Sequence, residues 1–384
     1  MTDANQEWDD ENRFISSDAG TGVEEETTES DELITDPFDP SLIRVSTKFL
    51  TIGQLIDRME DKALVLSPDF QRNFVWKPGA QSRLIESMFI RFPLPAFYID
   101  ATDDDQWLVV DGLQRLTSVK RFVLDKTLAL TELEFLGKQY NGKTYDELHA
   151  SLKRRINETL VTVYLIEKGT PPEVKFNIFK RINTGGLPLS PQEIRHAINQ
   201  GAVTQFLVRL ADSKEFKKAT DNGVHGARME DREMVLRFLA FSITPYTAYS
   251  TPDFDRFLSN KMAELNKILV FESEQRLWEQ RFKRAMNAAY NIFGSDAFRK
   301  RYGAKAKRSF VSKALFETWS VNLGKLTDKQ LELLTERREQ VQSEFINLMN
   351  TREFDGAVSQ GTGGISKVRM RFERIEKVIQ EVLS

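Results

Sequence analysis

The spacing of apolar residues in the first half of the chain changes from helix-like to strand-like and back. Residues 50–59 carry a broad apolar face that predicts a helix, and residues 64–66 predict a short strand. A second helix is expected to begin at Pro78, because the missing N–H of proline costs nothing in a first helical turn. Residues 97–100 and 107–110 are β-prone and flank an acidic turn, so they predict a hairpin.

Two further β-prone stretches, residues 135–140 and 160–166, complete a small mixed sheet. Helical spacing then returns and ends at residues 183–186, which include residue types that accept positive φ. Ser190 is expected to start the next helix as its N-cap, with Glu193 three residues later completing a capping box.

Beyond Gln200 nearly every segment has helical spacing. The predicted fold class is therefore α+β, with a small mixed sheet in a first domain over residues 46–200 and an α-helical domain over residues 201–384. Residues 1–43 are rich in Asp, Glu, Ser and Thr and poor in large apolar residues, which predicts a disordered acidic tail.

The net charge of −3 conceals an uneven distribution along the chain. Residues 1–40 hold fourteen Asp and Glu against one basic residue, Arg13, whereas residues 41–384 hold 53 Lys and Arg against 43 Asp and Glu. A body with a net charge of +10 attracts nucleotides and nucleic acid. The acidic tail either occupies the same surface or serves solubility.

The use of cysteine and histidine excludes several kinds of site. The chain has no cysteine, which rules out disulfides, iron–sulfur clusters and thiolate zinc sites, and its three histidines stand far apart. No apolar stretch approaches the ~20 residues that span a bilayer, and the first ten residues are acidic where a signal peptide is basic. These features predict a soluble, cytoplasmic protein with no membrane partner.

The most informative segment is VVDGLQRLTS, residues 109–118, which places an acid, a glycine, an amide and a guanidinium at a strand-to-helix junction. Gly112 permits a sharp reversal. The first helical turn, near Gln114 and Arg115, then offers free backbone N–H groups beside a cation, which favours a phosphate. Asp111 can hold a metal or orient water. The alternative is a structural corner in which Asp111 caps the helix and Arg115 pairs with a carboxylate.

Two further blocks accompany this motif: SPDFQRNFVWKPGAQSRLIESMFIRFPLPAFYID at residues 67–100 and FNIFKRINTGGLPLSPQEIRHAI at residues 176–198. In this order and spacing, the three blocks resemble the N-terminal domain of GmrSD-type restriction endonucleases, a family related to the ParB and sulfiredoxin folds. The resemblance covers roughly residues 46–200. The usual family motif is DGQQR, so Leu113 replaces its first amide, whereas Gln114 and Arg115 match.

The resemblance implies a subunit of a modification-dependent restriction or antiphage system that binds and hydrolyses a nucleoside triphosphate with Mg²⁺. DNA and a separate nuclease subunit are the implied partners. Arg72 and Arg115 would clamp the phosphates, Gln114 would position them or the water, and Asp111 would serve Mg²⁺ or act as the base. The full set expected at the nucleotide is Gln71, Arg72, Gly112, Arg115, Arg181, Asn183, Thr184 and Gly185.

Two other functions stay open. A metal-dependent DNA nuclease would use Asp111 and Glu86 around a metal ion, and a non-enzymatic adaptor would use the nucleotide as a switch for DNA binding. The HNH-like nuclease half of fused family members needs clustered histidines, and the C-terminal 150 residues contain none. A Gly-rich stretch before the basic C-terminal helix, residues 359–371, is a second candidate phosphate loop, although such linkers are common.

Overall fold

The computed structural model describes residues 22–24, 26, 42–66, 76–182, 189–251, 253–304 and 306–384. The chain divides into two compact units: Pro37–Leu189, and a second unit that combines Met1–Asp36 with Ser190–Ser384. The first unit holds the sheet and the second is helical, which confirms the predicted α+β class.

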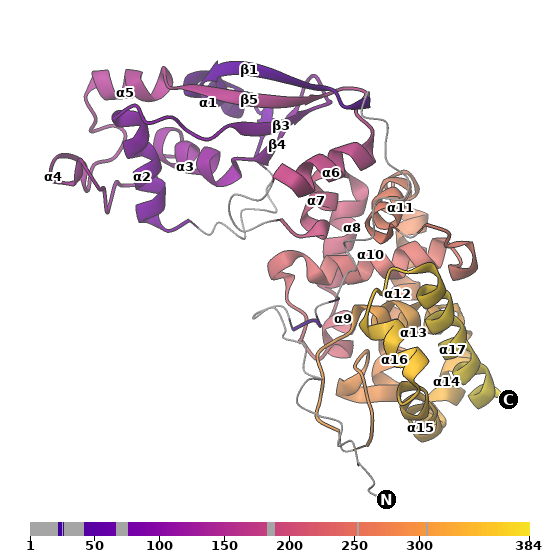
Figure 1. The fold of residues 1–384 in the computed structure, drawn as a ribbon. Coiled ribbons are helices and arrows are strands. Elements are labelled where there is room, and N and C mark those ends of the chain that lie inside the picture. Colours follow the sequence, from indigo (N-terminus) through magenta and orange to yellow (C-terminus); the bar gives the residue numbers. More distant parts are fainter. Residues whose placement is uncertain are drawn as a thin grey trace, which may run out of the picture. The chain divides into compact units, whose positions relative to one another are not determined.

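The sheet of the Pro37–Leu189 unit has five strands in the order β1-β5-β3-β4-β2 (Figure 1). The antiparallel hairpin of β3 and β4 is present as predicted, and β1 pairs antiparallel with β5. The pairs β3–β5 and β2–β4 are parallel, so the sheet is mixed, as predicted. The strand bounds are β1 Val45–Thr51, β2 Leu64–Val65, β3 Phe97–Ala101, β4 Trp107–Asp111 and β5 Leu160–Glu167.

Four helices bury one face of this sheet in a common hydrophobic core. Alternate residues of β5, Val161, Val163 and Leu165, enter that core, which is the burial that their period of two predicts. A further helix, α6 (Pro172–Ile182), reaches the strand residue Asp100 through Lys175, whose Nζ lies 3.0 Å from a carboxylate oxygen. The four core helices are α1 (Ile52–Glu60), α2 (Pro78–Phe89), α3 (Leu113–Val123) and α5 (Ala150–Asn157).

Two local predictions for this unit are wrong. Residues 135–140 are not a strand, since they contain the single-turn helix α4, Gly137–Tyr140. The predicted first helix begins later, at Ile52, because Thr51 is its N-cap and forms a capping box with Gln54. The residues just before this cap form the edge strand β1, whose largely exposed side chains give no alternating apolar signal.

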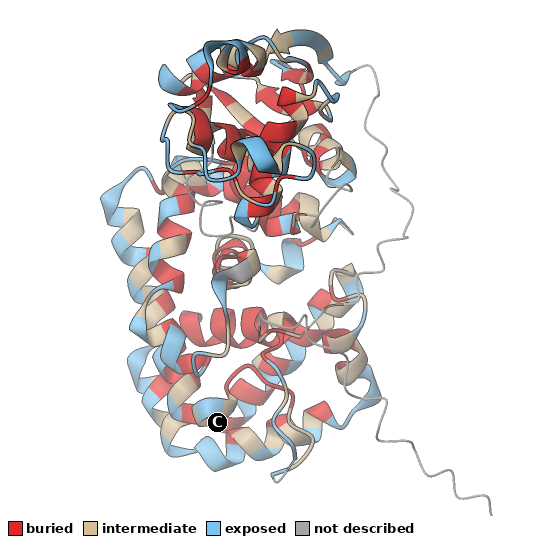
Figure 2. Ribbon diagram, turned by 90° about the vertical axis from the view of Figure 1, so that its left-hand side faces the viewer, coloured by how far each residue is buried: buried red, intermediate tan, exposed pale blue. Residues whose placement is uncertain are grey.

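The second unit packs its helices around one large hydrophobic core, which Figure 2 shows as buried positions along the helices. Ser190 caps α7 in the predicted capping box with Glu193. Residues 328–349 form two helices that meet at Arg337. The helix bounds are α7 Pro191–Ile198, α8 Ala202–Ala211, α9 Lys214–Ala219, α10 Glu230–Ile243, α11 Phe254–Ile268, α12 Glu272–Phe293, α13 Lys313–Lys325, α14 Asp328–Glu336, α15 Arg338–Met349, α16 Arg352–Ser359 and α17 Ile365–Leu383.

A short piece of the acidic N-terminal segment is built into this helical unit. Val23 is 2% exposed in the hydrophobic core and forms a parallel bridge with Val311, where the Glu24 N–H donates to the Val311 carbonyl at 2.9 Å. Glu24 pairs with Lys300, and Glu26 pairs with Arg237. Within the acidic segment over residues 1–43, residues 22–24 and 26 are thus held by contacts with residues far along the chain.

In the part of the chain that the structure describes, no helix combines the length and the apolar character needed to cross a membrane.

Candidate functional site

The junction between β4 and α3 turns at Gly112 as the sequence predicts. Gly112 has φ +100° and is the N-cap of α3. A Cβ atom at this position would lie 2.3 Å from Cδ1 of Phe97, so glycine is required both by the backbone conformation and by the close approach of the ring. The chain can therefore leave the sheet and enter α3 directly after Asp111.

A β-bulge in β4 determines the position of the Asp111 side chain. Ile99 lies opposite Val109, but Tyr98 lies opposite Asp111, so β4 holds Val110 as one extra residue. Without the bulge, Tyr98 would face Val110. The Asp111 carboxylate consequently stands beside Tyr98 and keeps 34% of its side-chain surface exposed. Bulges often re-aim a side chain at a functional site, and this one gives the acid of the motif access to solvent.

The Arg115 guanidinium is directed at protein groups. Nη2 donates to Oδ2 of Asp111 at 2.7 Å and to the Ala96 carbonyl at 3.1 Å, and Nη1 donates to the Pro95 carbonyl. The guanidinium carbon also lies 4.5 Å from the ring centroid of Phe97. Burial lowers the Arg115 pKa, and the charge of Asp111 opposes that shift. With 11% of its side chain exposed, Arg115 pairs with a carboxylate, which was the structural alternative left open by the sequence, and its guanidinium is not directed at solvent.

Asp111 and the first turn of α3 form the accessible part of the corner. Oδ2 of Asp111 is engaged by Arg115, while Oδ1 accepts no hydrogen bond from the described residues. The N-cap of α3 is a glycine, which has no side chain to cap the helix, and the partial positive charge of this helix end favours an anion. The arrangement can hold a phosphate on backbone amides beside one free carboxylate oxygen.

Glu86 does not belong to this site. Its Oε1 accepts the backbone N–H groups of Phe135 and Leu136 at 2.8 and 2.7 Å, and its Oε2 accepts that of Glu134 at 2.8 Å. The side chain is 2% exposed. The prediction that Glu86 shares a metal with Asp111 is therefore wrong, because both oxygens hold the chain at residues 134–136. These three hydrogen bonds use the backbone N–H groups of residues 134–136, which a β-strand would need for pairing with a neighbouring strand. This explains why no strand forms there.

The remaining predicted residues are distributed as follows. Arg181 is exposed in the last turn of α6. The Gln114 carbonyl accepts the Ser118 hydroxyl at 2.7 Å within α3. The other expected nucleotide-binding residues lie outside the described residues, namely Gln71, Arg72, Asn183, Thr184 and Gly185.

The second candidate phosphate loop binds the chain's own acidic segment. The Thr362 hydroxyl donates to Oε1 of Glu26 at 2.9 Å. Arg371 of α17 is fully buried, pairs with Glu317 and donates to the Thr362 carbonyl. An internal carboxylate thus takes the place that the sequence offered to a phosphate.

A pair of aromatic residues near the corner was missed by the sequence reasoning. Tyr98 on β3 and Tyr164 on β5 stack with ring centroids 4.8 Å apart and an interplanar angle of 19°. Only strand register reveals the pair, because the two residues are far apart in sequence and meet through the parallel pairing of β3 with β5.

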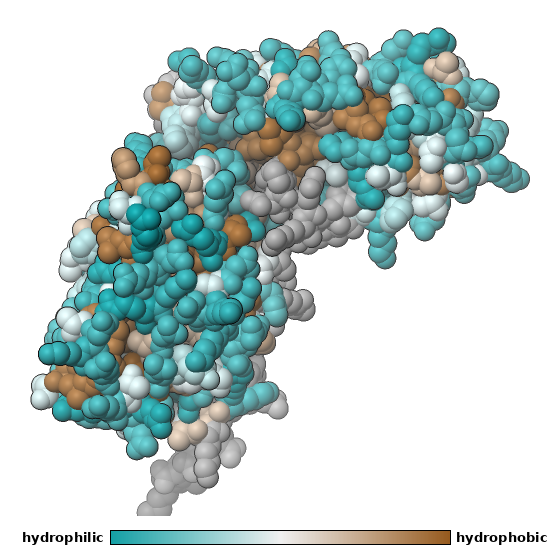
Figure 3. Space-filling view, turned by 180° about the vertical axis from the view of Figure 1, so that it is seen from behind, coloured by the Kyte–Doolittle hydropathy of each residue, from teal (hydrophilic) through white to brown (hydrophobic). Residues whose placement is uncertain are grey.

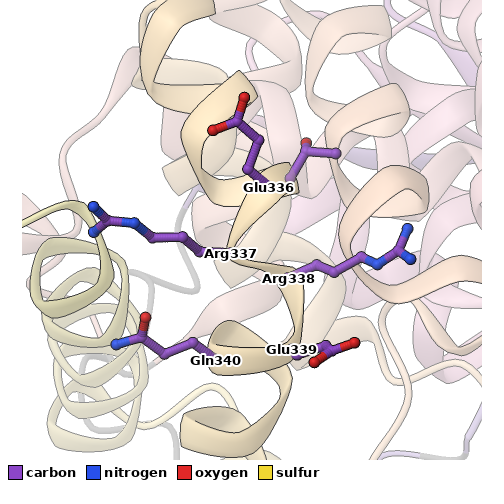
Figure 4. Close-up of a pocket in the computed structure, with 6 residues that line it drawn as sticks. Glu336, Arg337, Arg338, Glu339 and Gln340 are labelled. Atoms are coloured by element: carbon purple, nitrogen blue, oxygen red, sulfur yellow. The ribbon is translucent and has the colours of Figure 1, made fainter.

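A depression in the surface of the helical unit offers no comparable chemistry. It lies at the junction of α14 and α15, and six consecutive residues line it, Thr335–Gln340. Figure 4 shows Arg337 and Arg338 pointing in opposite directions from this junction, so the guanidinium groups do not converge on one ligand. Among the described residues, no group of three or more His, Asp or Glu side chains is placed to hold a metal ion.

Residues 52–199 match the model of the family described as GmrSD restriction endonuclease, N-terminal domain. This part of the chain is similar to the N-terminal domain of GmrSD restriction endonucleases. The match confirms the resemblance inferred from the three sequence blocks, and it spans Asp111, Gly112 and Arg115 together with the tyrosine pair. Neither curated proteins nor solved structures showed a significant match to the chain.

Proposed function

We propose that the GmrSD-like domain of this chain binds a nucleoside triphosphate and hydrolyses it, as a subunit of a restriction or antiphage defence system. DNA and a separate nuclease are its proposed partners. The observation that carries the proposal is the corner at Gly112, where a helix with a glycine N-cap begins directly after an acid whose Oδ1 accepts no hydrogen bond from the described residues. The family's name supports the defence role.

The backbone amides of the first turn of α3 would hold the phosphates. The helix has eleven residues, and its dipole adds a partial positive charge at this end. The Arg115 guanidinium donates hydrogen bonds to the Pro95 and Ala96 carbonyls and to Asp111, so we assign it a positioning role. It fixes Oδ2 of Asp111 and so orients Oδ1. Gln114, in the same first turn, would orient the phosphates or the attacking water.

A divalent cation fits this corner only together with the substrate. Mg²⁺ is usually held by one or two carboxylates plus phosphate oxygens. Asp111 offers one carboxylate, and among the described residues it belongs to no group of three or more side chains that could hold a metal ion. Mg²⁺ bound there would neutralise charge on the phosphates.

The decisive experiment incubates the purified protein with each nucleoside triphosphate, Mg²⁺ and plasmid, and measures phosphate release and DNA topology in the same sample. We expect phosphate release without DNA cleavage. Nicking without phosphate release would support a nuclease instead. Nucleotide-dependent DNA binding without turnover would support the adaptor.

The matched variants are Asp111→Asn and Asp125→Asn. Asn at position 111 still offers an oxygen to Arg115 but removes the charge, so we expect turnover to fall by about a hundredfold or more while the fold is kept. Asp125 pairs with Lys120 at the surface, at 2.6 Å, and its replacement should leave turnover unchanged. Full turnover by Asp111→Asn would remove Asp111 from the mechanism.

A further inference from the structure

Four strands place a row of residues across the sheet face that lies away from the helical core. Thr47 of β1 is opposite Tyr164 of β5, Tyr164 is opposite Tyr98 of β3, and Tyr98 is opposite Asp111 of β4. Directly opposed residues project from the same face of a sheet. The candidate catalytic acid is therefore one end of a row whose middle is the stacked tyrosine pair.

The two tyrosine rings stand side by side at the spacing of the strands that carry them. Their centroid distance of 4.8 Å equals the usual separation of neighbouring strands. Each ring thus has one face against the other ring and one outer face, toward β1 for Tyr164 and toward β4 for Tyr98. Burial, with smaller effects of Tyr164 and Asp111, raises the pKa of Tyr98, in agreement with a phenol close to the carboxylate.

The outer face of the Tyr164 ring lies beside the short side chain of Thr47. Thr47 is exposed, and it is too small to cover an aromatic ring. Beside it on the same face, Phe49 is 68% exposed opposite Thr162, and Leu160 is 62% exposed opposite Thr51. Figure 3 shows hydrophobic residues gathered in separate patches on a mostly hydrophilic surface. Phe49 and Leu160 are diagonal neighbours on this face, and contiguous exposed apolar surface beside a polar site marks a binding surface.

We infer that this row is the base subsite of the nucleotide site, in which a nucleobase stacks on Tyr164 above Thr47 and contacts Phe49. The inference rests on the proposed function. Thr47 on β1 and Asp111 on β4 are three strand spacings apart, roughly 14 Å. A ribose and a phosphate chain can bridge that distance along the row to Asp111 and the amides of α3.

The chemistry of the row favours a planar ring over other occupants. Aromatic faces at stacking distance select flat π systems, and stacking is tolerant of base identity because every base has a π face. The described residues beside Thr47 on this face, Thr162 and Phe49, carry no charge. We therefore expect the site to bind different nucleoside triphosphates with similar affinity. Its specificity should come from contacts with the triphosphate and not from contacts with the base.

The test compares ATP with inorganic tripolyphosphate by calorimetric titration. We expect Tyr164→Ala and Phe49→Ala each to weaken ATP binding, by about 5- to 150-fold for the tyrosine, and to leave tripolyphosphate binding unchanged. Tyr164→Phe keeps the ring and should bind ATP like the parent protein. Phe271→Ala is the matched control, since Phe271 is 64% exposed on the helical unit.

The outcomes separate this inference from the proposed function. Equal loss of ATP and tripolyphosphate binding in Tyr164→Ala would mean a disturbed sheet, and Phe49→Ala then decides, because an exposed side chain contributes little to folding. ATP binding that is unaffected by both variants overturns the base subsite and leaves the function standing. If the parent protein binds neither ligand, the proposed function fails, and the base subsite fails with it.

Discussion

Glu26 and Arg237 form a bidentate ion pair across 211 residues of sequence. Nη1 of Arg237 donates to Oε1 of Glu26 at 3.0 Å, and Nη2 donates to Oε2. Arg237 lies on α10 and is 4% exposed at its side chain, and Glu26 is 12% exposed. The Thr362 hydroxyl donates to the same carboxylate. The acidic N-terminal segment thus contributes a buried, hydrogen-bonded charge to the helical unit.

Glu26→Gln should destabilise the helical unit. The amide has an NH2 donor in place of one carboxylate oxygen, so it cannot accept from both guanidinium nitrogens in this bidentate geometry, and the charge that offsets Arg237 is lost. Because Arg237 keeps Glu233 and Glu317 as partners, we expect a loss of about 1–3 kcal/mol in the free energy of unfolding, measured by chemical denaturation.

The control is Glu272→Gln, which makes the same chemical change at a side chain that is 82% exposed. It should change stability by less than about 0.5 kcal/mol. Equal effects of the two variants would show that the Glu26 contact is not formed in solution.

Stability at acid pH should depend on this pair. Burial raises the Glu26 pKa, but the charge and hydrogen bonds of Arg237 outweigh it, so the pKa lies below its ordinary value of 4.5. A lowered carboxyl pKa contributes stability above the unfolded value, and that contribution is lost as pH falls through the folded value. The gap in unfolding free energy between the parent protein and Glu26→Gln should be constant above about pH 5 and narrow below pH 4.5.

The neighbouring acids act in opposite directions. The pKa of Glu233 is also lowered, because the charges of Lys313, Arg237 and Arg195 outweigh its burial. Burial raises the pKa of Glu24, so the stability associated with that group increases as pH falls. The comparison with Glu26→Gln removes these shared contributions. A gap that stays constant down to pH 3 would contradict the assigned shift.

Gly112→Ala should destabilise the sheet unit by two separable effects. The positive φ penalises any Cβ by about 1–2 kcal/mol. Contact with the Phe97 ring adds roughly 1–3 kcal/mol of overpacking. Gly142→Ala isolates the first effect, since Gly142 has φ +83° and a Cβ there would meet nothing within 4 Å. Thermal or chemical unfolding should show the larger loss for Gly112→Ala, and equal losses would mean that Phe97 moves aside freely.

Much of the fold can be predicted from short sequence patterns, because the local structures that they specify are kept when the chain packs. The hairpin, the cap at Ser190 and the reversal at Gly112 are each set by a few adjacent residues, and all three are present. The edge strand β1 and the docking of Val23 depend on partners more than a hundred residues away. Such elements carry no periodic signal of their own, so the sequence could not reveal them.

The candidate site shows the same division. The corner itself was predicted, and the sequence left two directions open for the Arg115 side chain. Arg115 could face a ligand or the carbonyls of residues 95 and 96, and only the path of the chain before β3 decides between them. Glu86 was predicted to bind a metal because a carboxylate is a common metal ligand. In the structure, both of its oxygens accept backbone N–H groups from a loop 48 to 50 residues later in the sequence.

The acidic tail should weaken binding of DNA or nucleotide at low salt. Deleting residues 1–21 removes six acidic residues and Arg13 while keeping the docked residues 22–24 and 26. We expect tighter binding at low salt and a gain that shrinks as salt rises, because exposed charges are screened beyond a Debye length of ~8 Å at physiological ionic strength.

Deleting residues 1–40 removes Val23 and Glu26 as well, so that variant should also unfold more readily. A gain that persists at high salt would indicate a steric block, and equal binding at every salt concentration would leave the tail with a solubilising role only.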